Sequence, residues 1–315
     1  MIEPRSTATA WAPASVSNLG PGFDALGAAL SFAGDTVSVT RTDGGGCVVQ
    51  FDPLGAWSGP TDPSMNTAAL AALRVGELAG YTGGLFIKIR KGLKAGTGLG
   101  SSAASSVAAA VAANALFGSI LSPHELINPV MHGESAVSGS PHGDNVLPSL
   151  FGGFVLGRSR SPLNHVRIQG WDGLHLAIIL PDIQVLTRSA REILPTSISL
   201  ADAVDHASRL GLLVDALHRQ DAQALATLAM SEQLIEPLRA SLISVYDVIK
   251  QAALDAGALG CALSGSGPAM LAFSDDQEEA ELIRQAMETA CTTLNVECLT
   301  VIDKINNQGA HVIVG

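Results

Sequence analysis

The segment from Lys94 to Ser106 constrains the fold more than any other part of the chain, because it places three glycines within five residues directly before two serines and an alanine-rich run. Residues 85–90 alternate apolar and charged side chains, which predicts a strand before it. Residues 102–116 are rich in strong helix formers and end near Gly118, which predicts a helix after it. Glycines let the backbone approach a ligand closely, and a helix N-terminus attracts anions. The order strand, glycine loop and helix therefore predicts a phosphate-binding loop.

Length and charge limit the classes of protein that this chain can represent. Its 315 residues suffice for two domains, and its net charge of −11 with 18 scattered basic residues argues against nucleic acid or an anionic membrane surface as partner. The four cysteines lack metal or redox spacing, so we interpret them as reduced thiols. The sequence shows no basic-then-apolar leader pattern and no apolar run long enough for a membrane span. We therefore expect a globular protein of the cytoplasm.

The predicted strands and helices mix without a strict βα alternation, which indicates an α+β fold rather than a doubly wound sheet. A polar, turn-rich stretch over 158–173 suggests two domains, at residues 1–160 and 170–315. The sequence Ser122-Pro-His-Glu125 is a capping box that predicts a helix reaching Glu134. Further strands are expected at 36–40, 47–51, 152–156, 174–180, 260–263, 268–273 and 296–301, and further helices at 63–80, 187–194, 199–219 and 276–294.

The run from Lys94 to Ala104, KAGTGLGSSAA, resembles the phosphate loop of the GHMP kinase superfamily, which includes galactokinases, homoserine kinases and mevalonate kinases. Lys94 stands where that family usually has a proline. Residues 12–24, APASVSNLGPGFD, resemble the N-terminal signature of the homoserine kinases specifically. Three further segments resemble motifs of the same superfamily. The first is Glu134 together with residues 141–145, and the second is the segment from Thr187 to Arg191 together with Arg239. The third is the glycine-rich segment 257–268. The resemblance thus covers nearly the whole chain.

The resemblance implies two α+β domains with the active site in the cleft between them, the C-terminal domain being an α+β sandwich. It implies ATP as the phosphoryl donor and Mg²⁺ as the cofactor, with Ser102 and Glu134 holding the metal. Oxygen ligands of this kind suit Mg²⁺, which commonly retains several waters. Asn66 would begin the adenine pocket. The nucleotide would contact Lys94, Ala95, Gly96, Thr97, Gly98, Leu99, Gly100, Ser101, Ser102, Ala103 and Ala104.

The resemblance also implies a small-molecule substrate, L-homoserine, which would be phosphorylated on its side-chain hydroxyl for threonine biosynthesis. A carboxylate can pair with the substrate ammonium, and an arginine fork matches the substrate carboxylate. The substrate-binding residues would be Asn18 at the hydroxyl, Asp24 at the ammonium, Thr187, Arg191 and Arg239 at the carboxylate, and His142, Asn145 and Gly265 along the pocket. The catalytic residues would be Ser102, Glu134, Asn18 and Asp144, with Asp144 as the candidate general base. The resemblance also allows a reaction without a dedicated base.

Simpler interpretations exist for each segment: a glycine turn before a buried helix, an Asx-rich turn at Asn18, a solvated carboxylate at Glu134, and surface arginines. A GHMP kinase for mevalonate or a sugar is the first alternative function. A neutral sugar needs no carboxylate clamp, and mevalonate has no ammonium for Asp24. A non-catalytic ligand-binding relative is the second alternative, and it would be marked by the loss of Ser102 or Glu134. A homodimer is common in the family, so the resemblance allows this assembly, but nothing in the sequence fixes it.

Overall fold

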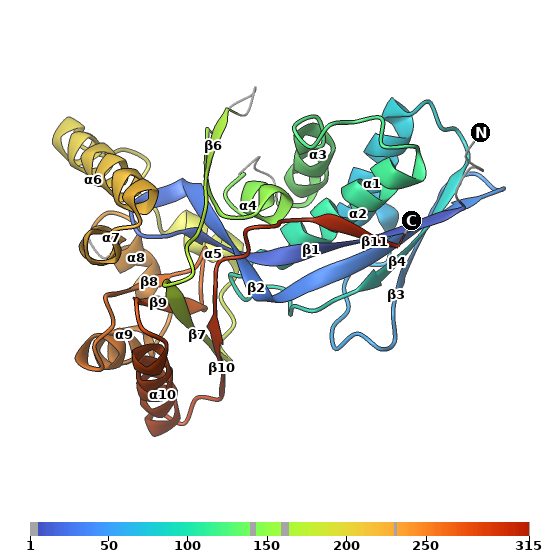
Figure 1. Ribbon diagram of the computed structural model, residues 1–315. Helices are drawn as coiled ribbons and strands as arrows, with labels where there is room; N and C mark the ends of the chain where they lie inside the picture. Colours follow the sequence, from blue (N-terminus) through green and yellow to red (C-terminus); the bar gives the residue numbers. More distant parts are fainter. Residues whose placement is uncertain (1–5, 139–142, 159–163, 230–231, 315) are drawn as a thin grey trace.

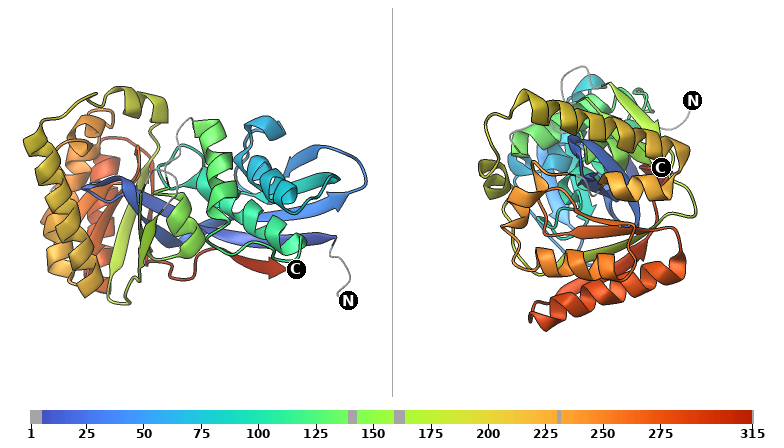
Figure 2. Two further views of the ribbon diagram at one scale, coloured as in Figure 1. Left: turned by 90° about the horizontal axis from the view of Figure 1, so that it is seen from above. Right: turned by 90° about the vertical axis from the view of Figure 1, so that its left-hand side faces the viewer.

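The structure, a computed structural model, describes residues 6–138, 143–158, 164–229 and 232–314. Two β-sheets, each covered by helices, form neighbouring parts of the molecule (Figures 1 and 2). This architecture confirms the predicted α+β class. The larger sheet has the strand order β11-β1-β2-β4-β3, with β5 paired to β2 and β6 paired to β5. Its strands are β1 (Thr7–Asn18), β2 (Gly22–Thr42), β3 (Cys47–Phe51), β4 (Gly84–Arg90), β5 (Phe154–Gly157), β6 (His165–Ile168) and β11 (His311–Val314).

Helix α2 (Ser101–Leu116) lies at the centre of the larger part and contacts both the sheet and neighbouring helices. Most of its residues are buried, including Ala103, Ala108 and Ala112. Alanine side chains are small and favour a helix, so α2 can be surrounded without opening gaps in the core. The other helices here are η1 (Pro63–Met65), α1 (Thr67–Leu78), α3 (Ile127–Ser138) and α4 (Val146–Phe151).

The smaller sheet is antiparallel, with the order β10-β7-β9-β8. Its strands are β7 (His175–Pro181), β8 (Gly260–Leu263), β9 (Met270–Ser274) and β10 (Cys298–Asp303). Alternate residues of β7 belong to two hydrophobic clusters: Leu176 and Ile178 pack in one cluster, and Ala177 and Ile179 pack in the other. This alternation follows from the period of a strand, whose successive side chains point to opposite faces. The helices of this part are α5 (Thr187–Glu192), α6 (Leu200–Arg219), α7 (Ala222–Ala229), α8 (Glu236–Ala240), α9 (Tyr246–Asp255) and α10 (Gln277–Thr293).

One hydrophobic cluster joins the two parts and sets the position of the glycine loop. It contains Val16 of β1 and Leu99 of the loop together with Leu271 and Phe273 of β9, all of them nearly inaccessible to solvent. Removal of such side chains from water favours association of the two parts. The loop is therefore packed at the junction of the two sheets.

Several predicted elements differ from the observed ones. The capping box forms, since Ser122 and Glu125 exchange hydrogen bonds, but α3 begins only at Ile127. The expected helix over 63–80 is divided into η1 and α1 at Asn66, whose side chain caps α1. The strands expected at 36–40 and 47–51 are not paired with each other, because β4 lies between β2 and β3. The strand order is decided by partners far away in the sequence, whereas the division at Asn66 is made by local capping bonds.

The chain crosses between the two sheets more than once. Strand β6 lies within the expected boundary stretch and belongs to the larger sheet, and β11 returns to pair with β1. The division into domains at 1–160 and 170–315 stays a prediction. Among the described residues, no helix combines the length and apolar character that crossing a bilayer requires.

Candidate active site

The glycine loop between β4 and α2 needs glycine for conformational and steric reasons. Gly96, Gly98 and Gly100 have φ values of 76°, 81° and 65°, in the left-handed region that other residues rarely adopt. A Cβ on Gly98 would lie 2.4 Å from the Ser264 carbonyl oxygen, and one on Gly100 would lie 2.2 Å from Ser15 Oγ. The predicted strand, loop and helix are confirmed here, and the loop is held tightly between β1 and the turn after β8.

The N-terminus of α2 faces the same loop without a side-chain cap. Its N-cap is Gly100, and no acidic residue occupies the first turn. The first N–H groups of a helix lack partners within the helix and carry the positive end of its dipole. This arrangement can bind a phosphate group in the way that helix N-termini generally do.

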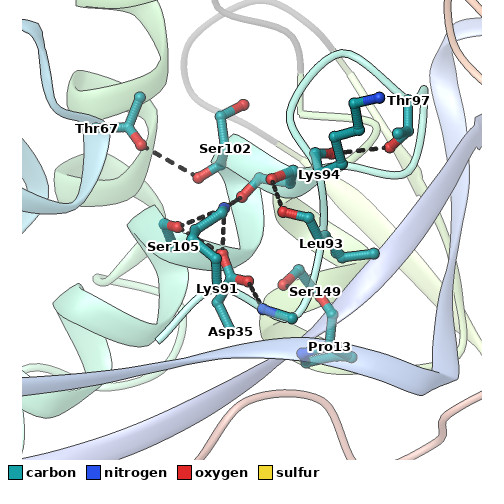
Figure 3. Close-up of polar contacts among 12 residues, drawn as sticks. Pro13, Asp35, Thr67, Lys91, Leu93, Lys94, Thr97, Ser102, Ser105 and Ser149 are labelled. Atoms are coloured by element: carbon teal, nitrogen blue, oxygen red, sulfur yellow. Dashed lines mark hydrogen bonds and ion pairs between the residues drawn. The ribbon is translucent and has the colours of Figure 1, made fainter. Parts of the chain in front are cut away.

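A buried lysine beneath the loop is a feature that our sequence analysis missed (Figure 3). Lys91 Nζ lies 2.5 Å from Asp35 Oδ2, 2.7 Å from the Ser101 carbonyl oxygen and 2.9 Å from Ser105 Oγ. Asp35 is 0% exposed and also accepts a hydrogen bond from the Gly92 N–H. The network ties β2 and the end of β4 to the first turn of α2. Lysine is almost never buried unless it is paired, and nothing local in the sequence marks this one.

The loop borders a cavity of about 230 Å³ that both parts of the molecule line. Five predicted loop residues line it: Ala95, Gly96, Thr97, Gly98 and Gly100, followed by Ser101 and Ser102 of α2. The remaining lining includes Ser17, Asn18, Asp24, Glu134, Asp144, Asn145, Arg191, Arg239, Gly265 and Ser266. The cavity thus collects residues that lie up to 249 positions apart in the sequence (Ser17 to Ser266).

Other predicted nucleotide contacts lie outside this cavity. Leu99, Ala103 and Ala104 are buried in the hydrophobic core. Lys94 pairs with Asp182 at 3.0 Å on the surface. The roles predicted for these residues stay predictions, and for the buried ones only backbone groups could take part.

Asn66 is engaged in local structure. Its Oδ1 accepts the N–H of Ala69 at 3.0 Å, and its Nδ2 donates to the Pro60 carbonyl oxygen at 2.8 Å. These bonds fix the start of α1, and the predicted adenine contact stays a prediction.

Ser102 and Glu134 face each other across the cavity wall. Ser102 Oγ donates to Glu134 Oε2 at 3.1 Å, which joins the first turn of α2 to α3. Burial raises the pKa of Glu134 from 4.5 to about 7, against the opposing effects of the Ser102 hydrogen bond and the Lys91 charge. One carboxylate and one hydroxyl beside a phosphate-binding loop fit the oxygen ligands that Mg²⁺ takes when substrate phosphates complete its shell.

The raised pKa of Glu134 predicts a pH dependence of stability for the metal-free protein. Because the folded protein holds this proton to a higher pH than the unfolded chain does, ionisation of Glu134 favours unfolding. The free energy of unfolding should therefore fall as the pH rises from about 5 to about 8, by on the order of 3 kcal/mol. Urea unfolding with a chelator present measures this, and Glu134→Gln should flatten the decline. Equal pH profiles for the two proteins would contradict the assignment.

The corner between β1 and β2 has an unusual backbone. Asn18, Leu19 and Asp24 adopt φ values of 75°, 48° and 53° although none is glycine. Asn18 Nδ2 donates to the Gly265 carbonyl oxygen at 2.8 Å, and the Asp24 N–H donates to Asn18 Oδ1 at 3.1 Å. Non-glycine residues in this region are uncommon, and such strain is often found at functional sites. The corner places the Asp24 carboxylate at the cavity.

Two arginines reach this corner from the smaller part of the molecule. Arg191 on α5 binds Asp24 through two hydrogen bonds, of 2.7 and 3.0 Å. Arg239 on α8 donates to the Gly265 carbonyl oxygen at 2.8 Å and lies over the Phe23 ring at 4.9 Å. Burial, and then the neighbouring Arg191 charge, lower the pKa of Arg239. Two guanidinium groups at one end of the cavity can bind a carboxylate.

Asp144 and Asn145 close the cavity on the side of the larger sheet. Burial, and then the charge of Asp24, raise the pKa of Asp144 to about 6. Asn145 accepts a hydrogen bond from Ser15 Oγ at 2.9 Å and donates one to Ser17 Oγ at 3.1 Å. The structure does not describe the side chains of two other predicted substrate-binding residues. His142 lies outside the described residues, and Thr187 begins α5 but its side chain is outside them as well.

Residues 66–153 match the GHMP kinases N terminal domain, and residues 213–293 match the GHMP kinases C terminal domain. The chain is 39% identical to the homoserine kinase of Chloroherpeton thalassium over 97% of this chain and 99% of that protein. The crystal structure of homoserine kinase from Cytophaga hutchinsonii has a TM-score of 0.92 to it, at 39% identity and 99% coverage of both chains. The crystal structure of L. major mevalonate kinase in complex with R-mevalonate has a TM-score of 0.73, at 19% identity and 98% coverage of both, and shares the fold.

The fold, the glycine loop and these matches define the chain as a GHMP kinase. Within that class it belongs to the homoserine kinase family, with which it shares nearly its full length.

Proposed function

We propose that the protein transfers the γ-phosphoryl group of ATP to the side-chain hydroxyl of L-homoserine, forming ADP and O-phospho-L-homoserine. Membership of the homoserine kinase family supports this reaction. The observation that carries the proposal is the content of one cavity, which holds the glycine loop, the Ser102–Glu134 pair, and Asp24 with two arginines. A phosphate donor, a metal and a zwitterionic amino acid require these three sets of groups. The product would enter threonine biosynthesis.

The donor phosphates would lie against the backbone N–H groups of residues 96–102, at the positive end of α2. Ser102 and Glu134 would hold Mg²⁺, which neutralises charge on the phosphates when it is bound. Lys91 places its ammonium 2.7 Å from the Ser101 carbonyl oxygen and so holds the first turn of α2 from below. Phosphoryl transfer depends mostly on positioning and on charge stabilisation of this kind.

The adenosine part of ATP would extend from the loop into a second cavity. This cavity has a volume of about 760 Å³ and shares Ala95, Gly96 and Thr97 with the first. Trp57 and Phe32 supply aromatic surface in its wall. A cavity of about 230 Å³ is small for a whole nucleotide beside an amino acid, since ligand sites for drug-sized molecules span roughly 300–1,000 Å³. The second cavity adjoins the first at these three shared residues and has a volume in the range of ligand sites. Asn66 does not line it, so this placement of adenosine does not use the predicted Asn66 contact.

The substrate would lie between Asp24 and the arginines, with its hydroxyl toward the loop. Asp24 would bind the ammonium, Arg191 and Arg239 the carboxylate, and Asn18 would orient the hydroxyl. Asp144 is the candidate for accepting the hydroxyl proton, and its pKa of about 6 leaves it mostly ionised near neutral pH. Bond breaking to the leaving group is well advanced in a loose transition state, so the contribution of this base is expected to be modest.

The alternative functions give a role to fewer of the residues that line the cavity. A sugar would use neither Asp24 nor the two arginines as charged partners, and mevalonate would leave Asp24 without an ammonium. The likeness to mevalonate kinase at 19% identity concerns the fold alone. A non-catalytic relative would not need the Ser102–Glu134 pair, which this chain retains. Homoserine therefore gives a role to more of the residues that line the cavity than mevalonate or a sugar does.

Location and assembly follow from the sequence and the family resemblance. The family resemblance supports a cytoplasmic enzyme, and scattered basic residues support small molecules rather than nucleic acid or membranes as partners. The resemblance supports a homodimer with domains at 1–160 and 170–315.

The test is ADP release from Mg·ATP by the purified protein with L-homoserine, mevalonate or galactose as acceptor. Turnover with homoserine alone is the expected result, because only homoserine offers an ammonium, a carboxylate and a hydroxyl together. Mass spectrometry of the product should show a phosphate ester on the side-chain oxygen. Turnover with mevalonate or galactose instead would overturn the substrate assignment.

A further inference from the structure

The two side chains that the proposed function assigns to the two charged groups of the substrate, Asp24 and Arg191, bind each other in this structure. Arg191 Nη1 lies 2.7 Å from Asp24 Oδ2, and Arg191 Nη2 lies 3.0 Å from Asp24 Oδ1. Two parallel bonds of this length form a bidentate pair, the strongest arrangement for these groups. The side chains of Asp24 and Arg191 are only 17% and 35% exposed. The contact is therefore shielded from water far more than an ordinary surface pair.

The protein holds both partners firmly. The Asp24 N–H is bound to Asn18 Oδ1 at 3.1 Å, and the Asp24 backbone has a left-handed φ of 53°. Arg191 lies in the last turn of α5 and stacks near the Phe23 ring, at 5.8 Å from its centroid. Another ion pair on α5, Arg188 with Glu192, is far more exposed, at 88% and 60%. Only the Asp24–Arg191 pair faces the cavity.

We propose that the Asp24–Arg191 pair occupies the place of the zwitterionic substrate and makes the site selective for molecules that carry both charges. This inference rests on the proposed function. Homoserine replaces the contact on both sides: its carboxylate pairs with Arg191, and its ammonium pairs with Asp24. A ligand with one charged group that inserts between Asp24 and Arg191 also breaks this pair, but it leaves the other protein charge without this salt bridge. Removing one member of an ion pair that is partly shielded from water has a cost, because the other charge remains.

Arg239 lies beside this arrangement, and the charge of Asp24 acts on it as well. Arg239 donates hydrogen bonds to two backbone oxygens, of Gly265 at 2.8 Å and Ala190 at 3.3 Å. It can therefore attract a carboxylate before the pair opens. Selection against single charges is an example of specificity by penalising the wrong ligand as well as favouring the right one.

The test uses two halves of homoserine, 3-aminopropan-1-ol and 4-hydroxybutanoate, whose dissociation constants are measured by calorimetry at 0.15 M salt. Arg191→Gln leaves Asp24 without this partner, so it should bind 3-aminopropan-1-ol about tenfold more tightly than the wild type, or about 1.4 kcal/mol. Asp24→Asn should likewise strengthen binding of 4-hydroxybutanoate. Both variants should bind homoserine itself more weakly.

The matched control is Arg188→Gln, which removes a positive charge from the same helix but from an exposed pair. It should leave all three affinities unchanged, because Arg188 is exposed to solvent and does not line the cavity, and salt weakens the effect of exposed charges. No gain for either half-substrate in the cavity variants would overturn the proposal. Homoserine turnover by the wild type tests the proposed function separately, so the two failures can be told apart.

A second measurement needs only the wild-type protein. Acetate and methylammonium should bind cooperatively, because whichever ion opens the Asp24–Arg191 pair leaves the other charge available to its counterion. By linkage, each ion should strengthen binding of the other by the same factor. Independent binding of the two ions would also overturn the proposal, even if a variant failed to fold.

Discussion

Replacement of Glu134 with glutamine is expected to lower kcat with Mg·ATP and homoserine by about 10²–10³-fold. Glutamine keeps the shape of the side chain and can still accept the 3.1 Å hydrogen bond from Ser102, but it removes the only negative charge of the proposed metal site. Loss of one group that stabilises charge in a transition state commonly has an effect of this size. Steady-state kinetics over a range of Mg²⁺ concentrations would measure it.

The control is Glu125→Gln, which changes an exposed carboxylate that accepts hydrogen bonds from Ser122 just before α3. It should leave kcat unchanged. The free energy of unfolding should not fall in Glu134→Gln at neutral pH, because burial already disfavours the ionised carboxylate. A variant that folds normally and keeps full turnover with an unchanged Mg²⁺ dependence would remove Glu134 from the metal site.

Replacement of Lys91 with methionine is expected to lower the free energy of unfolding by about 3–5 kcal/mol. The substitution fills a similar volume but leaves the carboxylate of Asp35, which is 0% exposed, without its ammonium partner. It also removes the donor to the Ser101 carbonyl oxygen, so the first turn of α2 should hold phosphates less well. Urea unfolding measures the first effect, and the KM for ATP, expected to rise, measures the second.

The neighbouring Lys94→Met is the matched control, since Lys94 makes an exposed ion pair with Asp182. Its effect on unfolding should be within about 1 kcal/mol. The double variant Lys91→Met/Asp35→Asn should recover part of the lost stability, because it removes the uncompensated charge. Equal effects of Lys91→Met and Lys94→Met would show that the buried network contributes little.

Local sequence signals predicted the elements whose hydrogen bonds are local. Ser199 caps α6 by accepting the Asp202 N–H at 3.1 Å, and Asp276 caps α10 in the same manner. The glycine loop was predicted for the same reason: left-handed backbone at three alternate positions can hardly be formed by other residues. These features depend on neighbours within a few residues, so the sequence pattern is sufficient to find them.

Elements that depend on distant partners were predicted poorly. Strand β2 is far longer than the expected segment 36–40, because different portions of it pair with β1, β4 and β5. Short strands β6 and β11 were missed altogether, since each is stabilised by pairing with a strand that is already in place. A short apolar run carries little information about which edge it will join.

At the candidate site, too, some features were predicted from the sequence and others depend on contacts between distant residues. The family resemblance named most of the residues that line the cavity, including Asp24, Arg191 and Arg239. It did not indicate that Asp24 and Arg191 bind each other, nor that Lys91 is buried beneath the loop. Both facts depend on which side chains face each other after the chain has folded.

Residue identity and short spacings in the sequence determined the phosphate-binding loop, and the resemblance of its motifs to the GHMP kinases indicated the class of protein and the chemical types of the groups around the loop. The tertiary structure alone decided how these groups are paired and which of them are shielded from water. Asp24 and Arg191 are 167 residues apart, and Lys91 and Asp35 are 56 apart. Ion-pair strength depends on distance and burial, and neither can be read from positions so far apart in a chain.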